Sequence, residues 1–570
     1  MKRTFKYLSA VILAVMLVVT FCLPVSAAAG TNNSITITPT DENNHTYEAY
    51  QIIMGDVATD NETLSNPAWG DNIDTTTLLG ALAANTAYGD PNPFATAATV
   101  NDVLDVLSQQ ADNSAFAIAF AKDAGNSLIN AAKGTANTKE NGKYVISGLT
   151  AGYYLVKDKD GTQNGEDMAY TLNLLKVAGA VAVTAKADVP TIDKKIIDGT
   201  GTVESNTASI GDNVPYILTS SVPDMTGYNK YYFVVNDTMS AGLTFNDDVS
   251  IRIGDHTLAQ NDFAVTTDAA TNSVKIVIKN FIQYADKKGD KIEITYSANV
   301  NNNADMTQVG NKNIVNLTYS NNPNVNYTGT DEPVSGEPTG ETPDVSTKTY
   351  VTQIKLIKVD GSDHTKLLAG AQFKLEGIHN SVVFVSEDGK FVYDTAGTYW
   401  RLKALTADGK VQFTTTAPTD ATSDQYYSTG LKFKKVSETS EIAAEEKISM
   451  TATTNAQGEL EFPGLGAGTY TITELVAPDK YNLLSEPITV TITGVSHNSD
   501  SGCDWSVSPS NAVYDAANQL ITLTVENNIG ITLPGTGGIG TTVFYVVGGL
   551  MVCGAIVLLI VKKRMDIKEK

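Results

Sequence analysis

The sequence predicts a mainly β protein: tandem Ig-like β-sandwich domains, the first with a helical insertion, between an N-terminal signal peptide and a C-terminal transmembrane helix. Three observations predict this class. Short segments with alternating apolar and polar residues recur along most of the 570-residue chain, separated by turn clusters. An Ala-rich stretch, residues 75–133, instead carries apolar residues at helical spacing. Long apolar runs stand near the two ends.

Composition narrows the classes of function. The chain has 63 acidic and 40 basic residues and a net charge of −23, and so acidic a surface repels phosphate backbones. We therefore expect no nucleic-acid partner. The five His are scattered, and no P-loop or Rossmann glycine pattern is present, so we predict no metal and no cofactor. The length suggests roughly three domains.

The N-terminus predicts export. Three basic residues among the first six precede an apolar run over residues 8–23, and small residues follow at 25–27. This pattern is typical of a secretory signal peptide, here residues 1–27. Of the three Cys, Cys22 lies in this segment and Cys553 in the C-terminal apolar run, so the processed chain is expected to keep Cys503 and to form no internal disulfide.

The C-terminus holds three ordered parts. Residues 541–561 form an apolar run long enough to span a bilayer, and a basic tail follows. Just before the run stands a pentapeptide, Leu533, Pro534, Gly535, Thr536 and Gly537. In this order the parts, residues 533–570, resemble the LPxTG cell-wall sorting signal of Gram-positive surface proteins. The resemblance implies that a sortase Cys cleaves the Thr536–Gly537 bond and passes Thr536 to an amine.

The first unit expected between the ends covers residues 31–186. Thr99 is a plausible N-cap for a helix over 100–109, and a second helix is expected over 114–133. Strands are expected at residues 34–39, 47–54, 143–147, 152–157 and 169–177. This pattern indicates a β domain that carries a helical insertion.

Two further units follow, over residues 187–330 and 348–530. The second unit alternates clearly at 274–279 and 291–299. Residues 328–347 are rich in Pro, Gly, Thr and Glu and are predicted to be a linker. A short echo, GLTAGYY at 148–154 and GLGAGTY at 464–470, suggests common ancestry of the first and third units.

Three polar residues of the third unit fall on apolar strand faces, because strand side chains repeat every two residues. Glu474 shares a face with Tyr470 and Ile472. Lys358 and Asn527 likewise share faces with their apolar neighbours at i−2 and i−4. A buried unpaired charge is very costly, so either these residues lie at strand ends or they react.

The reaction that removes the charge is formation of a Lys–Asn isopeptide bond. In an apolar site the pKa of Lys falls and the pKa of a carboxyl rises, so both groups become neutral. The neutral amine is the nucleophile, and the protonated acid polarises the Asn amide and relays protons. Ammonia leaves, and an amide links two strands.

Two motifs carry a family resemblance. Residues 470–481 (YTITELVAPDKY) resemble the E-box of Gram-positive pilins, and residues 367–373 (LLAGAQF) resemble the LxGAxF strand of collagen-adhesin B-type domains. The resemblance implies that Lys358 is the amine, Asn527 the amide and Glu474 the catalytic acid. Lys355 is the competing amine, because it shares a face with Ile357 and Val359.

The second unit resembles the isopeptide-forming D2 domain of pilins. The matching segments are residues 190–195 (PTIDKK), 236–244 (NDTMSAGLT) and 310–321 (GNKNIVNLTYSN). The resemblance implies that Lys194 and Asn313 form the bond and that Asp237 is the acid. Three other residues stay open as the amide: Asn311, Asn316 and Asn321.

The first unit departs from the pattern. The internal echo places Asp158 where Glu474 stands, but the opening strand, residues 35–38, has no Lys. We therefore predict no isopeptide bond in the first unit, although it resembles the N-terminal domains of pilins.

The resemblance as a whole is to the major, or backbone, pilin of a sortase-assembled pilus. It implies a structural subunit and not an enzyme that acts on an external substrate. A pilus-specific sortase would join Thr536 of one subunit to a Lys of the next. Lys186, at the end of the first unit, takes the place of the family's YPK-type Lys, although the Tyr and Pro are absent; Lys176 is the alternative.

The resemblance also implies the partners and the location. The partners are other pilin subunits, a housekeeping sortase with peptidoglycan, and host surface ligands, and the location is the cell wall and surface. The alternative function is a monomeric wall-anchored adhesin for a host matrix protein or glycan. A ladder of covalent polymers on a denaturing gel separates the two.

Overall fold

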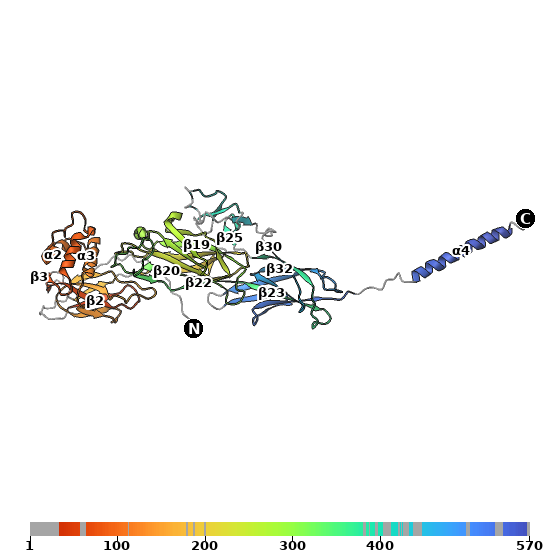
Figure 1. The fold of residues 1–570 in the computed structure, drawn as a ribbon, viewed down its shortest axis with the longest axis horizontal. Coiled ribbons are helices and arrows are strands. Elements are labelled where there is room, and N and C mark those ends of the chain that lie inside the picture. The colour runs from red at the N-terminus through yellow and green to blue at the C-terminus, as the bar shows by residue number, and fades with distance from the viewer. Residues whose placement is uncertain are drawn as a thin grey trace.

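The computed structural model contains three groups of β-sheets in a row (Figure 1). We call them the N-terminal region (residues 33–185), the middle region (193–350) and the C-terminal region (352–530). The structure describes residues 33–566 except 58–63, 112, 178–179, 186–187, 199–200, 380–382, 387, 394–396, 403–411, 420–421, 423–424, 426–432, 437–446, 497–501 and 531–539. The predicted signal peptide, Lys186 and the pentapeptide at 533–537 lie outside the described residues.

The N-terminal region has two sheets and a helical insertion, as predicted. One sheet has the order β5-β1-β8, and the other β3-β2-β6-β7 with β4 on β2. The strands are β1 (Asn33–Thr38), β2 (Tyr47–Val57), β3 (Leu64–Trp69), β4 (Gly134–Ala136), β5 (Tyr144–Leu149), β6 (Gly152–Asp158), β7 (Leu174–Val177) and β8 (Ala180–Thr184). The helices are α1 (Thr75–Ala84), η1 (Thr86–Tyr88), α2 (Val100–Leu107) and α3 (Ala115–Asn126).

Local sequence explains where these helices begin and end. Thr99 caps α2 as predicted, in a capping box with Asp102. α3 ends at Asn126 rather than at residue 133, because the polar Asn126–Ser127 pair ends the apolar pattern and Asn130 takes a positive φ. β7 begins at Leu174 rather than at residue 169, because the preceding segment bonds to the middle region instead of to a strand.

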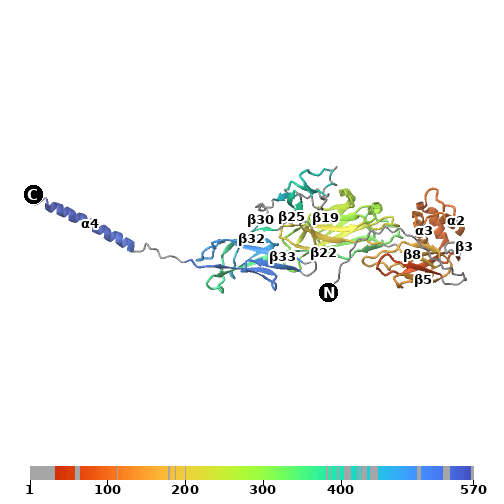
Figure 2. The same cartoon turned by 180° about the vertical axis from the view of Figure 1, so that it is seen from behind.

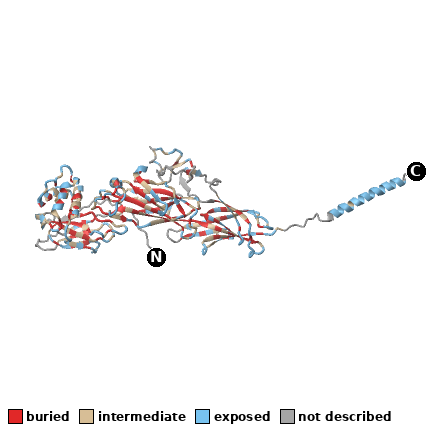
Figure 3. Ribbon diagram, in the orientation of Figure 1, coloured by how far each residue is buried: buried red, intermediate tan, exposed pale blue. Residues whose placement is uncertain are grey.

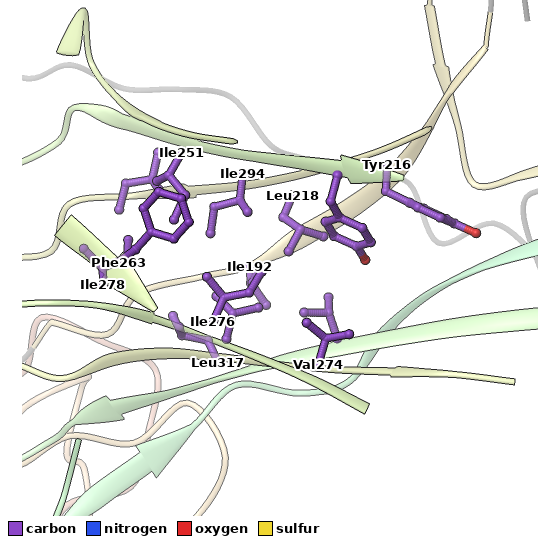
Figure 4. Close-up of a cluster of buried hydrophobic side chains, with 14 of the residues drawn as sticks. Ile192, Tyr216, Leu218, Ile251, Phe263, Val274, Ile276, Ile278, Ile294 and Leu317 are labelled. Carbon is purple, nitrogen blue, oxygen red and sulfur yellow. The ribbon is translucent and has the colours of Figure 1, made fainter. Parts of the chain in front are cut away.

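The middle region is a sandwich of two seven-stranded sheets. The first has the order β10-β9-β12-β19-β15-β16 with β14 on β19, and the second β11-β22-β20-β13-β18-β17 with β21 on β20. Apolar side chains from both sheets meet between them, among them Ile294 and Leu317 (Figure 4). The first sheet contains β9 (Asp193–Asp198), β10 (Gly201–Val203), β12 (Asn213–Ser221), β14 (Leu243–Phe245), β15 (Ser250–Ile253), β16 (His256–Thr257) and β19 (Lys291–Val300). The second contains β11 (Ser205–Thr207), β13 (Phe233–Met239), β17 (Phe263–Asp268), β18 (Ser273–Ile278), β20 (Asn311–Ser320), β21 (Thr339–Glu341) and β22 (Val345–Tyr350), and two short helices, η2 (Gln260–Asp262) and η3 (Phe281–Lys287), complete the region.

The linker prediction for residues 328–347 is wrong. β21 and the start of β22 fall within this segment, and both pair with β20. The Thr347 side chain points into the core and is 1% exposed. Glu337 accepts five hydrogen bonds, three from the backbone amides of Thr328, Gly329 and Val334 and two from the hydroxyls of Tyr232 and Thr328. Composition resembled a linker because the strands are short and the turns between them are rich in Pro and Gly.

The C-terminal region pairs a sheet of order β31-β23-β36-β35 with one of order β30-β24-β32-β33-β34. β23 and β36, the first and last strands, run parallel side by side. Its strands are β23 (Thr352–Asp360), β24 (Gln372–His379), β30 (Lys447–Thr453), β31 (Glu459–Leu465), β32 (Gly468–Val476), β33 (Ile488–Ser496), β34 (Cys503–Ser508), β35 (Ala512–Asp515) and β36 (Leu520–Asn527).

Between β24 and β30 the chain leaves this sandwich and lies against the middle region (Figures 1 and 2). This insertion contains β25 (Val383–Ser386), β26 (Gly389–Tyr393), β27 (Trp400–Leu402), β28 (Gln412–Thr414) and β29 (Phe433–Val436). Three of its rings, Phe391, Phe413 and Phe433, form a buried cluster with Ile197 of β9, and Ile217 of β12 packs against it. The insertion therefore covers the outer face of a middle-region sheet.

Hydrogen bonds join the regions in the row. At the first joint the Asn321 side chain donates to the Gln163 carbonyl at 3.0 Å, and the Asn321 carbonyl accepts the Tyr170 amide at 2.7 Å. At the second joint Gln308 exchanges two hydrogen bonds with the Cys503 backbone, at 2.7 and 2.9 Å. These hydrogen bonds hold the middle region against the N-terminal region at one end and against the C-terminal region at the other.

Beyond the sandwiches lies α4 (Gly540–Asp566), the one helix among the described residues that is long and apolar enough to cross a membrane. Its qualifying span, Thr542–Met565, has a mean hydropathy of 2.7 and packs against no other part of the described chain (Figure 3). This fits the transmembrane helix expected over residues 541–561.

Candidate functional site

In the C-terminal region the three expected polar residues meet in one buried cluster. Lys358 comes from β23, Asn527 from the parallel neighbour β36, and Glu474 from β32 in the facing sheet. The Lys358 Nζ donates to the Asn527 Oδ1 at 2.6 Å, and the Asn527 Nδ2 donates to the Glu474 Oε1 at 2.8 Å. Their exposed fractions are 0%, 2% and 7%, so the predicted inward orientation is confirmed.

The surroundings of this cluster increase the fraction of Lys358 that is a neutral amine. Burial outweighs the nearby carboxylate of Glu474 and lowers the pKa of Lys358 to about 8. The Phe373 ring lies 5.9 Å from the Nζ and keeps one side apolar. The second oxygen of Glu474 accepts the Leu484 amide at 2.8 Å, which holds the carboxyl in place against Asn527.

The competing amine lies elsewhere. Lys355 points from the opposite face of β23 and pairs with Glu459 at 2.8 Å on the partly exposed surface. It does not reach Asn527 or Glu474, so the geometry brings together Lys358 and not Lys355.

A second cluster fills the core of the middle region, between its two sheets. Lys194 of β9 donates to the Asp237 Oδ2 of β13 at 2.5 Å, and both side chains are fully buried. Asn313 of β20, 0% exposed, lies diagonally across from Asp237, because Asn313 is paired with Met239 in the register. The predicted Lys, Asp and Asn thus come from three different strands to one place.

A tyrosine that the sequence analysis did not single out connects this cluster. The Tyr296 hydroxyl of β19 donates to the Asp237 Oδ2 at 2.5 Å and accepts the Asn313 Nδ2 at 3.0 Å. Tyr296 lies on the same face as Ile292 and Ile294 in β19, a strand that the sequence predicted. Its hydroxyl on an otherwise apolar strand face was the feature from which its role could have been predicted. The Asn313 Oδ1 and Asp237 Oδ1 are buried without a hydrogen-bond partner.

Burial again moves both pKa values toward the neutral pair. It lowers the pKa of Lys194 to about 8 against the pull of Asp237, and it raises the pKa of Asp237 against the pull of Lys194. The rings of Tyr216 and Tyr296 lie 5.3 and 5.5 Å from the Lys194 Nζ, where their faces attract any residual positive charge. An amine, a carboxyl and an amide in a dry site can exchange ammonia for a new amide bond.

The other asparagines considered for this site are bonded elsewhere. Asn311 donates to the Asp305 and Thr349 carbonyls, at 3.0 and 3.1 Å. Asn316 donates to Asp344 at 3.0 Å on the exposed face, and Asn321 belongs to the joint with the N-terminal region. Of the four, Asn313 is the one that the Tyr296 hydroxyl links to Asp237, the partner of Lys194.

In the N-terminal region the buried carboxylate, Asp158, meets a histidine and not a lysine. Asp158 is 1% exposed, and its Oδ1 lies 2.8 Å from the His45 Nδ1, while the His45 Nε2 lies 3.1 Å from Asp41. Burial alone would lower the pKa of His45, but its hydrogen bonds to Asp158 and Asp41 and their charges raise it to about 9. Asp158 therefore makes an ion pair here.

Two predicted features of polymerisation are not placed. Lys186 and residues 533–537 fall outside the described part of the chain. For Lys176, the alternative to Lys186, the backbone lies in β7 opposite Tyr154.

Three segments of this chain match known protein families. Residues 210–323 match the family described as "Gram-positive pilin backbone subunit 2, Cna-B-like domain", residues 352–501 a "Prealbumin-like fold domain", and residues 526–566 the "LPXTG cell wall anchor motif". The "Trypsin-resistant surface T6 protein" of Streptococcus pyogenes serotype M6 is 27% identical over 436 residues, which cover 70% of this chain and 74% of that protein.

A solved structure shares the fold. The T6 backbone pilin of serotype M6 Streptococcus pyogenes superposes with a TM-score of 0.51 at 18% identity, over 89% of this chain and all of that one. That pilin is described as having a modular three-domain structure decorated with variable loops and extensions. With a pilin backbone domain, a prealbumin-like domain and an LPXTG anchor on one chain, this protein is similar to the sortase-assembled backbone pilins of Gram-positive bacteria and is a structural subunit of a cell-wall-anchored surface pilus.

Proposed function

We propose that this backbone pilin cross-links itself through two Lys–Asn isopeptide bonds, Lys358 to Asn527 and Lys194 to Asn313. A single observation carries the proposal: the Lys358 Nζ lies 2.6 Å from the Asn527 side chain while Glu474 contacts the nitrogen that must leave. Hydrogen-bond contact between nucleophile, amide and acid is the arrangement that covalent catalysis needs.

The reaction at this site balances without a co-reactant. The neutral Nζ of Lys358 attacks the Cγ of Asn527, and a C–N bond forms. The Cγ–Nδ2 bond of Asn527 then breaks. Glu474 passes one amine proton to the departing Nδ2, so ammonia leaves and Glu474 ends in its initial state. Each site acts once on its own chain, which is consistent with a protein that is not an enzyme.

At the second site Asp237 takes the place of Glu474. Its carboxyl accepts a hydrogen bond from the Lys194 amine at 2.5 Å, and the Tyr296 hydroxyl bridges it to the Asn313 nitrogen. We therefore propose that Asp237 takes the amine proton and that Tyr296 relays a proton to the departing ammonia. The unpaired Asn313 Oδ1 leaves that carbonyl free to be polarised by the acid.

Such bonds stabilise the fold because they close long loops. Lys358 and Asn527 are 169 positions apart. By the entropy model for cross-links, closing a 100-residue loop contributes about 4.7 kcal/mol. Since folded domains are stable by only about 5–15 kcal/mol, either bond is a large part of the total. In an exported chain that keeps only Cys503 after processing, these bonds replace disulfides.

The proposed bonds also lie on the path of a pulling force. We propose that a pilus sortase joins Thr536 of one copy to Lys186 of the next, with Lys176 as the alternative acceptor. Force would then enter near Lys186, cross from Lys194 to Asn313 in the middle region, and leave through Lys358 and Asn527. The N-terminal region stays outside this path, which gives a mechanical reason why it needs no cross-link.

Domain boundaries follow from the same arrangement. We place the first unit at residues 31–186 and the third at 348–530. We propose that the second unit begins at residue 187. The pairing of β21 and β22 with β20 supports an end of this unit near residue 350 rather than 330.

The test has two parts. The intact mass of residues 31–530 is expected to lie two ammonia masses below the value from sequence, and peptide mapping is expected to find Lys194–Asn313 and Lys358–Asn527. A measured mass equal to the value from sequence would contradict the isopeptide proposal. Separately, Lys186→Arg is expected to abolish the ladder of polymers in wall extracts, with Lys176→Arg as the matched control.

The finer partners belong to the proposal too. We propose a pilus-specific sortase for polymerisation, a housekeeping sortase for attachment to peptidoglycan, and host surface ligands for the assembled pilus. A single band in place of a ladder would favour the alternative function, a monomeric wall-anchored adhesin.

A further inference from the structure

The end of the C-terminal region that points away from the middle region is unusually apolar. Outside α4, ten large apolar side chains of the described residues are exposed, and five of them gather at this end. We call these five the apolar rim: Leu367, Leu475, Val476, Leu483 and Ile529, each between 44% and 54% exposed. Exposed apolar side chains are ordinary when scattered, but a cluster marks a contact surface.

Backbone and side-chain contacts hold the rim together. Ile529 pairs with Tyr481 in an isolated β-bridge, and the Tyr481 hydroxyl contacts Lys366, the residue before Leu367, at 2.7 Å. Asn482, the residue before Leu483, donates its amide to the Asn528 carbonyl at 3.0 Å. Leu475 and Val476 end β32, directly after Glu474, which contacts Asn527 near the chain exit.

The direction of the strands places the rim at the far end of the row. The chain just before β32 contacts the middle region, where the Gly466 amide donates to the Ser209 hydroxyl at 2.9 Å. β32 runs away from that joint and ends at Val476, and β36 ends at the same side. The rim therefore lies at the end of the C-terminal region opposite its joint with the middle region.

Chain length decides what can cover this surface. Thr536 is only seven positions after Ile529 in the chain, and seven fully extended residues span at most about 25 Å. Whatever amine is joined to Thr536 must therefore lie within that distance of the rim. In a pilus the molecule that supplies this amine is another copy of the same chain.

We propose that the apolar rim docks onto the next subunit, so that neighbouring copies are held by a non-covalent contact as well as by the sortase bond. This inference rests on the proposed polymerisation. A short tether raises the effective concentration of the two surfaces to about the millimolar range, so a weak apolar contact is enough to close the joint. The free monomer, without the tether, leaves the rim exposed.

Thiol labelling tests this docking in the assembled pilus. Cys503 is 3% exposed, and burial raises the pKa of its thiol to about 12, so it reacts poorly with thiol reagents. In processed chains a single introduced cysteine is therefore the thiol that is labelled. Leu483→Cys probes the rim. Val513→Cys is the matched control, because Val513 is 58% exposed in the same sandwich but lies toward the joint with the middle region, beside the Tyr514 that contacts Gln308.

The comparison is between monomer and wall-extracted polymer of each variant, labelled with a maleimide. We expect Leu483→Cys to react about tenfold more slowly in polymer than in monomer, as a joint closed roughly nine-tenths of the time requires, and Val513→Cys to react equally in both. Val476→Cys repeats the measurement at a second rim position, in case Leu483→Cys disturbs the fold.

The outcomes separate the two proposals. A ladder in which the Leu483→Cys and Val476→Cys positions label at the monomer rate would overturn the docking while leaving polymerisation intact. No ladder from the wild-type chain would overturn polymerisation, and the docking with it.

Discussion

Lys358 and Asn527 are in direct contact, with 2.6 Å between the Nζ and the Oδ1, although they are 169 positions apart in the chain. Lys194, by contrast, contacts the carboxylate of its site, and the Tyr296 hydroxyl stands between that carboxylate and the amide. The two sites therefore offer the same three groups in different contact orders. This difference makes separate predictions for each site possible.

Removing the acid is expected to stop one bond and leave the other. Glu474→Gln keeps the shape of the side chain but can no longer accept the amine proton, so the mass should rise by one ammonia relative to wild type. Asp237→Asn should do the same at the other site, and the double variant should lose both bonds. Intact-mass spectrometry of residues 31–530 measures each.

The matched control for the C-terminal site is Lys355→Ala, which removes the neighbouring amine without touching the cluster. It should retain both bonds. A Glu474→Gln chain that still carries both bonds would contradict the assigned role of Glu474.

Tyr296→Phe is expected to slow the middle-region bond specifically. The substitution keeps the ring beside Lys194 but removes the hydroxyl that joins Asp237 to the Asn313 nitrogen. A time course of ammonia loss after refolding should show the Lys194–Asn313 bond forming late or incompletely. The Lys358–Asn527 bond in the same chain serves as the internal control; equal rates at the two sites, as in wild type, would exclude a relay through Tyr296.

The N-terminal region is expected to lose stability as pH rises. The pKa of His45 is raised from 6.5 to about 9 in the folded chain by Asp158 and Asp41, which outweigh burial. A histidine whose pKa is higher in the folded than in the unfolded chain stabilises the fold. This stabilisation is complete at pH values below the unfolded-state pKa and is lost as the pH rises through the folded-state pKa. The loss should therefore fall between pH 6.5 and about 9, and amount to a few degrees in Tm.

Thermal melts across this range measure the effect, with His45→Gln as the comparison. The glutamine side chain can still form hydrogen bonds but carries no charge that titrates. The Tm of the variant should therefore be lower than the Tm of wild type at pH 6.5, and it should change less with pH. Equal pH slopes for the two chains would rule out the His45 ion pair as the cause.

The insertion of the C-terminal region is expected to depend on a residue of the middle region. Phe433 is 2% exposed in a cluster that also contains Ile197 of β9, at 7%. Removing a buried Phe side chain costs about 3–5 kcal/mol, so Phe433→Ala should release the insertion to proteolysis between β24 and β30. Ile197→Ser should increase the same cleavage, although it lies in another region.

Phe433→Leu is the conservative control and should give an intermediate cleavage rate. Because neither Lys194 nor Lys358 contacts the cluster, both ammonia losses should persist in all of these variants. Cleavage that increases with Phe433→Ala but not with Ile197→Ser would show that the insertion does not rely on the middle region.

Much of the candidate site could be predicted from the sequence. Lys358, Glu474 and Asn527 face inward as the alternation of their strands predicted, and Lys194 and Asp237, which the family resemblance implied, are buried as well. The helical insertion and the membrane-length helix lie where composition indicated. The segment at 328–347 was misjudged, because its strands are short and their partner, β20, is not adjacent in the chain. Tyr296 was missed because a buried tyrosine is ordinary in a β-sandwich core.

The pattern of residues along the chain was enough to assign which face of each strand a residue occupies and to order the predicted export and anchoring signals. Side-chain alternation is a local property of extended backbone, so it can be read without knowing the partner strand. The link from Asn313, among four candidates, through the Tyr296 hydroxyl to Asp237, and the gathering of the rim residues at one end, could be known only from the folded chain. These depend on register and sheet stacking between segments far apart in the chain, and a shift of one residue in register would move every side chain of a strand to the other face.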